Sequence, residues 1–126
     1  MKKQKRIILD TNFLLAISQF NIDIFSELER ICDFPYTVNV LDKTIDELNN
    51  IIKTPGAKDK AAAKLALAII EGRIMVIESE GSYVDDILVS LADKDTIIAT
   101  QDKELKRRIK YPIITIKQKK YLAFGH

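Results

Sequence analysis

The chain has 126 residues, of which 47% are hydrophobic and 30% are charged, and its formal net charge at pH 7 is +2. This length fits one domain over residues 1–126, and the composition excludes an intrinsically disordered chain. The longest apolar stretches are shorter than the ~20 residues that span a bilayer, and the first residues lack a signal-like core. We therefore expect a cytoplasmic protein that does not bind membranes.

Cysteine and histidine usage restrict the metal chemistry of the chain. Cys32 is the only cysteine and His126 is the only histidine. These counts exclude an intramolecular disulfide and a cysteine-based zinc site. Any metal ion would therefore need oxygen ligands.

Short apolar runs alternate with helical patterns along the chain. The runs at 6–9, 36–41, 74–77, 96–99 and 113–116 predict strands, because they are short, continuous and bounded by turn signals. Helices are predicted at 12–20, 23–32, 42–52, 57–71, 85–92 and 103–110, with Gly72 ending the fourth. This alternation predicts an α/β fold, a single three-layer domain with five parallel strands and helices on both faces.

Four acids lie at comparable positions in this pattern. Asp10 follows the first strand, Asp102 follows the fourth, Asp85 lies near the start of a later helix, and Glu47 lies inside the third helix. The carboxyl ends of parallel strands meet at one edge of a sheet, where open α/β sheets bind ligands. We therefore expect the four carboxylates to converge at that edge.

Each acid also has a simpler explanation. Asp10 and Asp102 suit helix N-caps, Asp85 suits the first turn of a helix, and Glu47 suits an exposed helix face. Helix periodicity separates Asp85, at the margin of an apolar stripe, from Asp86 on the polar side. The same test favours Glu47 over its neighbour Asp46, although less strongly.

A cluster of carboxylates predicts a bound cation. Carboxylates held together repel one another unless a cation neutralises them, and oxygen ligands alone select Mg²⁺ or Mn²⁺. One or two such ions can activate water and stabilise the leaving oxygen at a phosphodiester. The basic segment after Asp102 would then bind the substrate backbone through Lys103, Lys106, Arg107 and Arg108.

At these residues the sequence resembles the PIN-domain ribonucleases, in the family's order and spacing and over nearly the whole chain. The matching segments are Leu9-Asp10-Thr11-Asn12, Asp46-Glu47-Leu48, Val84-Asp85-Asp86-Ile87-Leu88 and Ile98-Ala99-Thr100-Gln101-Asp102. The last part, from Val84 onwards, is most similar to the branch that includes archaeal PIN proteins and a eukaryotic nuclease of small-subunit ribosomal RNA processing.

The resemblance implies a sheet order 3-2-1-4-5 and a Mg²⁺- or Mn²⁺-dependent endoribonuclease acting on single-stranded or loop RNA, with 5′-phosphate and 3′-hydroxyl products. It implies that four acids are catalytic metal ligands and that three further residues support them, namely Asp10, Glu47, Asp85 and Asp102, with Asn12, Asp86 and Thr100. It also implies a homodimer. The biological role would be ribosomal RNA processing or RNA metabolism with a ribosome-assembly partner, or that of a toxin paired with an antitoxin.

Two other functions fit parts of the pattern. A non-catalytic RNA-binding or docking module would use the basic segments, and its RNA affinity would survive loss of Asp10 and Asp102. A receiver-like phosphoacceptor domain has a similar length and sheet class, with Thr100 and Lys117 at receiver-like positions. A nucleotide-binding enzyme is disfavoured, because the chain has neither a G-x-G-x-x-G nor a Walker-type loop.

Overall fold

The computed structural model describes residues 3–81 and 83–125. Helices and strands alternate over this length, as the hydrophobic pattern predicted. In chain order the elements are β1 (Lys5–Leu9), α1 (Thr11–Gln19), α2 (Ile24–Ile31), β2 (Tyr36–Leu41), α3 (Asp42–Lys53), α4 (Lys60–Arg73), β3 (Met75–Ile77), α5 (Val84–Leu91), β4 (Thr96–Ala99), α6 (Lys103–Arg108), β5 (Ile113–Lys117) and β6 (Tyr121–Gly125).

The strands form one sheet with the order β3-β2-β1-β4-β5-β6. The first five strands are parallel, and β1 lies between β2 and β4. The predicted order 3-2-1-4-5 is therefore confirmed. The predicted number of strands was wrong, because β6 pairs antiparallel with β5 and adds a sixth strand at the edge.

The turn between β5 and β6 lacks the residues by which a hairpin is usually predicted. Gln118 and Lys119 have φ values of 53° and 57°, in the left-handed region that glycine and asparagine favour. Neither residue type stands there, so the usual turn signature is missing. The backbone N–H of Lys120 donates to the carbonyl oxygen of Lys117 at 3.0 Å and closes the turn.

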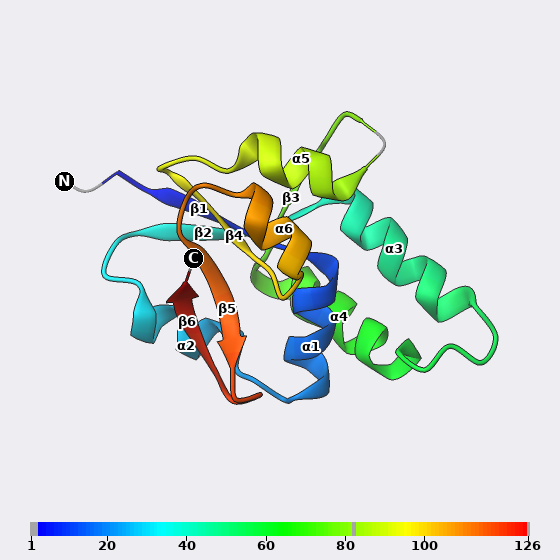
Figure 1. Ribbon diagram of the computed structural model, residues 1–126. Helices are drawn as coiled ribbons and strands as arrows, with labels where there is room; N and C mark the ends of the chain where they lie inside the picture. The colour runs from blue at the N-terminus through cyan, green and yellow to red at the C-terminus, as the bar shows by residue number, and fades with distance from the viewer. Residues whose placement is uncertain (1–2, 82, 126) are drawn as a thin grey trace.

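Side chains of β1 alternate between two hydrophobic clusters on opposite faces of the sheet. On one face, Ile7 belongs to a cluster with buried residues of α1, α2, α3 and α4, such as Phe13. On the other face, Ile8 packs with Leu88 of α5 and Leu105 of α6. Figure 1 shows α5 above the central strands and α2 below them. The predicted three layers are therefore confirmed.

The predicted boundaries of two helices were wrong by two or more residues. Helix α4 begins at Lys60 rather than at residue 57, and it continues through Gly72 to Arg73. A glycine inside a helix costs roughly 1 kcal/mol relative to alanine, and the buried residues Ala63, Ala66 and Ile70 hold this helix against the core. Helix α6 ends at Arg108, two residues before the predicted end. Within the described residues, no helix is long and apolar enough to cross a membrane.

Candidate active site

Asp10 lies at the junction between β1 and α1, at the carboxyl edge of the sheet. Its side chain is only 5% exposed. Oδ1 accepts the backbone N–H of Thr11 at 2.9 Å and caps α1, whereas Oδ2 accepts the hydroxyl of Thr100 at 2.9 Å. The capping explanation of Asp10 is therefore correct, and the same carboxylate also borders the edge where ligands bind in such sheets.

The pairing of β1 with β4 brings the first and last of the four predicted ligands, Asp10 and Asp102, into one region. Leu9 pairs with Ala99, and the backbone N–H of Asp10 donates to the Ala99 carbonyl oxygen at 2.9 Å. Thr100 then lies beside Asp10, and its hydroxyl oxygen accepts the backbone N–H of Asp102 at 3.1 Å. Thr100, predicted as a supporting residue, is the physical link between the two acids.

The environment of Asp10 favours its protonated form. Burial raises the pKa of this carboxyl to about 6, and the negative charges of Asp85 and Glu47 add to the increase. The hydrogen bonds from Thr100 and Thr11 act in the opposite direction. An acid that is buried beside two further acids is a common feature of functional sites, and a cation would relieve the repulsion.

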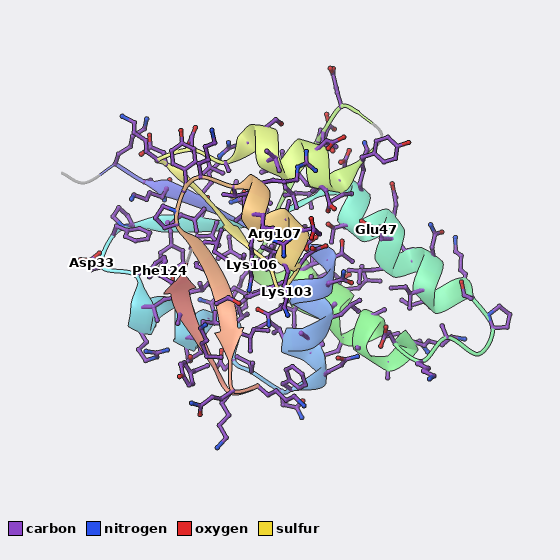
Figure 2. The ribbon with its side chains drawn as sticks, viewed as in Figure 1. Asp33, Glu47, Lys103, Lys106, Arg107 and Phe124 are labelled. Carbon is purple, nitrogen blue, oxygen red and sulfur yellow. The ribbon has the colours of Figure 1, made fainter. Side chains whose placement is uncertain are left out.

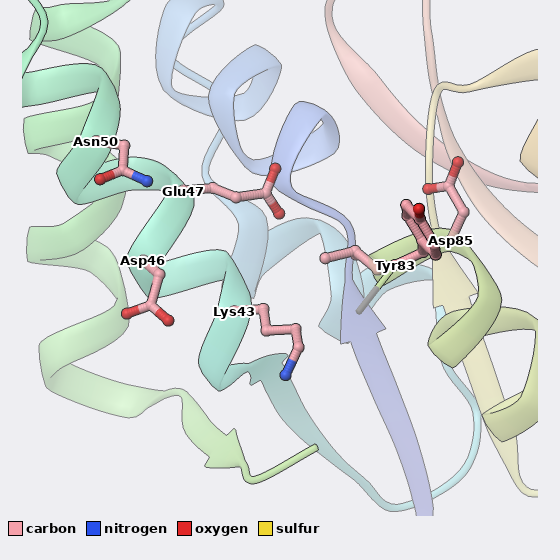
Figure 3. A pocket seen from close by; sticks show the side chains of 7 residues that line it. Lys43, Asp46, Glu47, Asn50, Tyr83 and Asp85 are labelled. Atoms are coloured by element: carbon pink, nitrogen blue, oxygen red, sulfur yellow. The ribbon is translucent and has the colours of Figure 1, made fainter. Parts of the chain in front are cut away.

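Glu47 extends from α3 towards the junction after β1. Its Oε1 accepts the hydroxyl of Thr11 at 3.1 Å, and the Thr11 and Thr44 hydroxyl oxygens lie 3.0 Å apart. Figure 3 shows Glu47 pointing towards the end of β1 and Asp46 pointing elsewhere. Sequence reasoning missed the two buried threonines as contributors to the site. Thr11 stands inside the Asp10-Thr11-Asn12 segment, whereas Thr44 has no sequence signal beyond its place on the buried face of α3.

Asp85 and Asp86 face different surroundings, as helix periodicity indicated. Asp85 and Glu47 both line a cavity of about 550 Å³. Asp86 instead accepts a hydrogen bond from the Arg108 guanidinium at 2.7 Å, which joins α5 to α6. The two acids therefore have separate positions, with Asp85 beside the candidate site and Asp86 engaged with a basic residue.

Asp102 is the N-cap of α6. Its Oδ1 accepts the backbone N–H groups of Glu104 at 2.8 Å and Leu105 at 3.2 Å. The capping explanation is correct for this acid as well, and it occupies one of the two carboxylate oxygens. Asn12 lies on the first turn of α1 with its side chain exposed.

The charges of Glu47 and Asp85 act on Asp10, and Thr100 links Asp10 to the backbone of Asp102. The four predicted ligands do not form a ligand shell. Within residues 3–81 and 83–125, no group of three or more histidine, cysteine, aspartate or glutamate side chains is arranged to hold a metal ion. The donor types nevertheless suit Mg²⁺ or Mn²⁺, because carboxylates and hydroxyls are hard oxygen ligands. The site therefore suits such an ion through the chemistry of its donor atoms. Asp10 is buried and held by hydrogen bonds, whereas the side chains of Glu47 and Asp85 are exposed.

The basic residues after Asp102 divide into two kinds. Arg107 forms an ion pair with Glu104 at 2.7 Å, and Arg108 forms one with Asp86 at 2.7 Å. Lys103 is exposed, and the half-buried Lys106 donates from Nζ to the Thr115 hydroxyl at 3.0 Å. Burial lowers the pKa of the Lys106 ammonium, and the positive charges of Lys117 and Lys103 lower it further. Figure 2 labels both lysines, and the contact with Thr115 places Lys106 beside β5. An anion bound there would relieve the repulsion between these lysines.

Comparison with known families decides the identity of this fold. The sequence model described as PIN like domain matches residues 7–119, which cover most of the chain. The chain belongs to this PIN-like family. The resemblance drawn from the sequence motifs is confirmed, and the receiver-like alternative does not account for this match.

Relatives of this PIN-like protein include two archaeal proteins. Ribonuclease VapC4 of Methanocaldococcus jannaschii is 31% identical over 128 residues, which cover 95% of this chain and 97% of that protein. Ribonuclease VapC9 of Archaeoglobus fulgidus is 31% identical over 110 residues, which cover 86% of this chain and 78% of that protein.

Solved structures also resemble the PIN-like fold of this chain. The PIN domain endonuclease Utp24 superimposes with a TM-score of 0.76 at 26% identity, covering 95% of this chain and 90% of that one. VapBC2 from Rickettsia felis, bound to a promoter DNA fragment, has a TM-score of 0.52 at 14% identity, covering 82% of this chain and 95% of that one. The second similarity shows the fold alone.

Proposed function

We propose that this PIN-like protein is a divalent-metal-dependent endoribonuclease that hydrolyses RNA phosphodiester bonds with Asp10, Glu47, Asp85 and Asp102. The observation that carries the proposal is the position of Asp10, which is buried at the carboxyl edge of the sheet with both carboxylate oxygens held by hydrogen bonds. Burial and the charges of two neighbouring acids raise its pKa, as is common at functional sites. The names of the similar proteins agree with this chemistry, since two are ribonucleases and one is an endonuclease.

In this proposal the four acids have different tasks. Asp10 is the rigid ligand, because Thr11 and Thr100 hold both of its oxygens. Glu47 and Asp85 would approach the ion from α3 and α5, and Asp102 would use the oxygen that does not cap α6. When bound, Mg²⁺ or Mn²⁺ would make a water molecule more acidic and stabilise negative charge on the phosphate.

The supporting residues act on the acids and on the substrate. Thr100 positions Asp10, Asp86 restrains Arg108, and Asn12 presents an exposed amide at the start of α1. Lys103 and Lys106 would contribute most of the RNA-backbone contact, because Arg107 and Arg108 are already paired with acids. For either arginine to bind RNA, a phosphate group of the RNA would have to replace the carboxylate with which that arginine is paired.

The biological setting divides into the two roles implied by the family. One role is ribosomal RNA processing with an assembly partner, and the other is a toxin held by an antitoxin. Homodimer formation is expected in both. Light scattering of the purified protein, alone and after co-expression with the product of a neighbouring gene, would separate a self-associating nuclease from a protein bound by an antitoxin.

The test of the proposed function is a cleavage time course on unpaired and structured RNA with Mg²⁺, Mn²⁺ or EDTA. We expect metal-dependent cutting with 5′-phosphate products, and its loss in Asp10→Asn and Asp102→Asn. Glu71→Gln on α4 is the matched control, because this acid is exposed and lies outside the site. Equal cutting by all variants would identify a contaminating nuclease. RNA binding that survives in both variants, without any cutting by the wild type, would favour the non-catalytic docking module.

A further inference from the structure

A cavity beside the acids contains residues that the proposed hydrolysis does not use. It has a volume of about 550 Å³ and lies between α3 and the start of α5. Glu47 and Asp85 line it, and so do Tyr83, Asn50 and Lys43. A substrate whose phosphate lies at the acids would therefore have an adjacent nucleotide near an aromatic ring and an amide.

Tyr83 is the most exposed of the large aromatic side chains in the described part of the chain, with 72% of its surface accessible. Its backbone is held in place, because it is the N-cap residue of α5 and its carbonyl oxygen accepts the backbone N–H of Ile87 at 3.1 Å. Asp85 follows it by two residues. The backbone of Tyr83 is therefore anchored next to a predicted metal ligand, and its ring is accessible to a ligand.

The wall of the cavity opposite Tyr83 is formed by residues of α3. Ser79, in the segment between β3 and α5, donates from its hydroxyl to Asp42 at 2.6 Å and accepts the Lys43 ammonium at its carbonyl oxygen at 3.2 Å. These contacts tie that segment to the start of α3. Asn50 and Glu47 lie on α3, one turn apart, on the side that lines the cavity.

We propose that this cavity binds the unpaired base next to the cleaved phosphate, with Tyr83 stacking on the face of the base and Asn50 hydrogen-bonding to its edge. This inference rests on the proposed ribonuclease function and adds the residues that select the substrate. A base can stack on a protein side chain only when it has left the helix, and single-stranded RNA is commonly recognised in this way. An asparagine amide presents one donor and one acceptor, a pattern that matches adenine.

Steady-state cleavage of a single-stranded oligoribonucleotide tests the role of the ring. Tyr83→Ala should raise KM roughly 5- to 100-fold, as expected for loss of one base stack, with a much smaller change in kcat. Tyr83→Phe should behave as the wild type because it keeps the ring. Tyr111→Ala is the matched control, since Tyr111 is 41% exposed and lies outside this cavity. Equal KM values for Tyr83→Ala and Tyr111→Ala would overturn the proposal.

A stacking readout that needs no cleavage uses the Asp10→Asn variant and oligonucleotides with 2-aminopurine at successive positions. We expect fluorescence quenching at one position, and its loss when Tyr83→Ala is added. Quenching that persists without the ring would overturn the proposal. Failure of the wild type to cut RNA would count against the proposed function alone, because this measurement reports on the cavity independently.

The edge contact is tested with a substrate carrying each of the four bases at the quenched position. The wild type should prefer adenine there, and Asn50→Ala should reduce that preference to less than about 3-fold while leaving the Tyr83-dependent quenching in place. A base preference that is the same in both proteins would overturn the role of Asn50. Equal melting temperatures of the variants would show that exposed substitutions leave the fold intact.

Discussion

Thr100 and Asp10, which are 90 positions apart in the sequence, are joined by a 2.9 Å hydrogen bond from the Thr100 hydroxyl to Oδ2 of Asp10. The same hydroxyl oxygen accepts the backbone N–H of Asp102 at 3.1 Å. One buried side chain therefore connects the junction after β1 with the junction after β4. This connection fixes two of the four acids relative to each other, and the first prediction tests it.

Replacing Thr100 by valine should raise the pKa of Asp10 further above 6, because the hydrogen bond from Thr100 lowers that pKa in the folded protein. The variant should also lose about 1–3 kcal/mol of stability, since a buried carboxylate oxygen and the Asp102 N–H lose a partner. Carboxyl carbon NMR titration in metal-free buffer measures the pKa. Thr100→Ser is the control, because serine keeps the hydroxyl. An unchanged Asp10 pKa in Thr100→Val would contradict the prediction.

The contribution of Asp10 to the free energy of unfolding should decrease as the pH rises from 4 to 6. Its folded-state pKa of about 6 lies above the ordinary 3.8, so the folded state binds this proton more tightly than the unfolded state. The contribution is complete below about pH 4 and is lost as pH rises through 6, by about 3 kcal/mol.

Urea unfolding of the wild type and Asp10→Asn at pH 4, 5, 6 and 7 measures this contribution. Other acids with lowered pKa values, such as Glu27 and Asp42, titrate in both proteins, so their effect cancels in the difference. The advantage of Asp10→Asn over the wild type should grow with pH. A difference that is constant across this range would be inconsistent with a raised Asp10 pKa.

Lys106 should contribute more to RNA affinity than Arg107, although both lie on α6. The Arg107 guanidinium is paired with Glu104. The Lys106 ammonium instead donates to the Thr115 hydroxyl and is influenced by the positive charges of Lys117 and Lys103. In the Asp10→Asn background, Lys106→Ala should weaken binding and reduce the slope of log affinity against log salt by about 0.7. Arg107→Ala should change both quantities less. Lys94→Ala, before β4 at the other end of the sheet, is the control, and a slope change equal to that of Lys106→Ala would contradict the prediction.

Glu27 should stabilise the edge strand β6. Its Oε1 accepts the backbone N–H of Leu122 at 2.8 Å, while its ion-pair partner Arg30 donates to the Leu122 carbonyl oxygen at 2.7 Å. These two side chains satisfy backbone groups that β5 does not reach. Glu27→Ala should therefore lower the free energy of unfolding by about 1–2 kcal/mol. Glu104→Ala is the matched control, because it removes an ion pair at the same spacing with Arg107 and should change stability little.

Some features of the site follow from residue patterns alone, and others depend on the tertiary structure. The segments around Asp10 and Asp102 were recognisable because each stands where an apolar run ends and a helix begins. Asp85 was recognisable because it lies near the start of a helix. Periodicity also separated Asp85 from Asp86, which face different neighbours in the structure. The involvement of Thr44 was not recognisable, because a threonine on a helix face has no distinctive spacing. The ion pairs of Arg107 and Arg108 depend on which acids fold against α6, and that is a tertiary property.

By itself, the sequence determined the alternation of strands and helices, the membership of the PIN-like family and the residues from which a site would be drawn. These features depend on the local hydrophobic period, on turn residues and on short motifs. Each of these signals is contained in a short segment of the sequence. Only the tertiary structure decided that Tyr83 and Asn50 share a cavity with Glu47 and Asp85. It also decided that a sixth strand pairs with β5 at the edge of the sheet, after a turn that has no usual sequence signature. Both depend on strand register and on the packing of segments that are distant in the sequence. Contacts between such segments contribute to stability only in the folded chain, so a local sequence pattern does not reveal them.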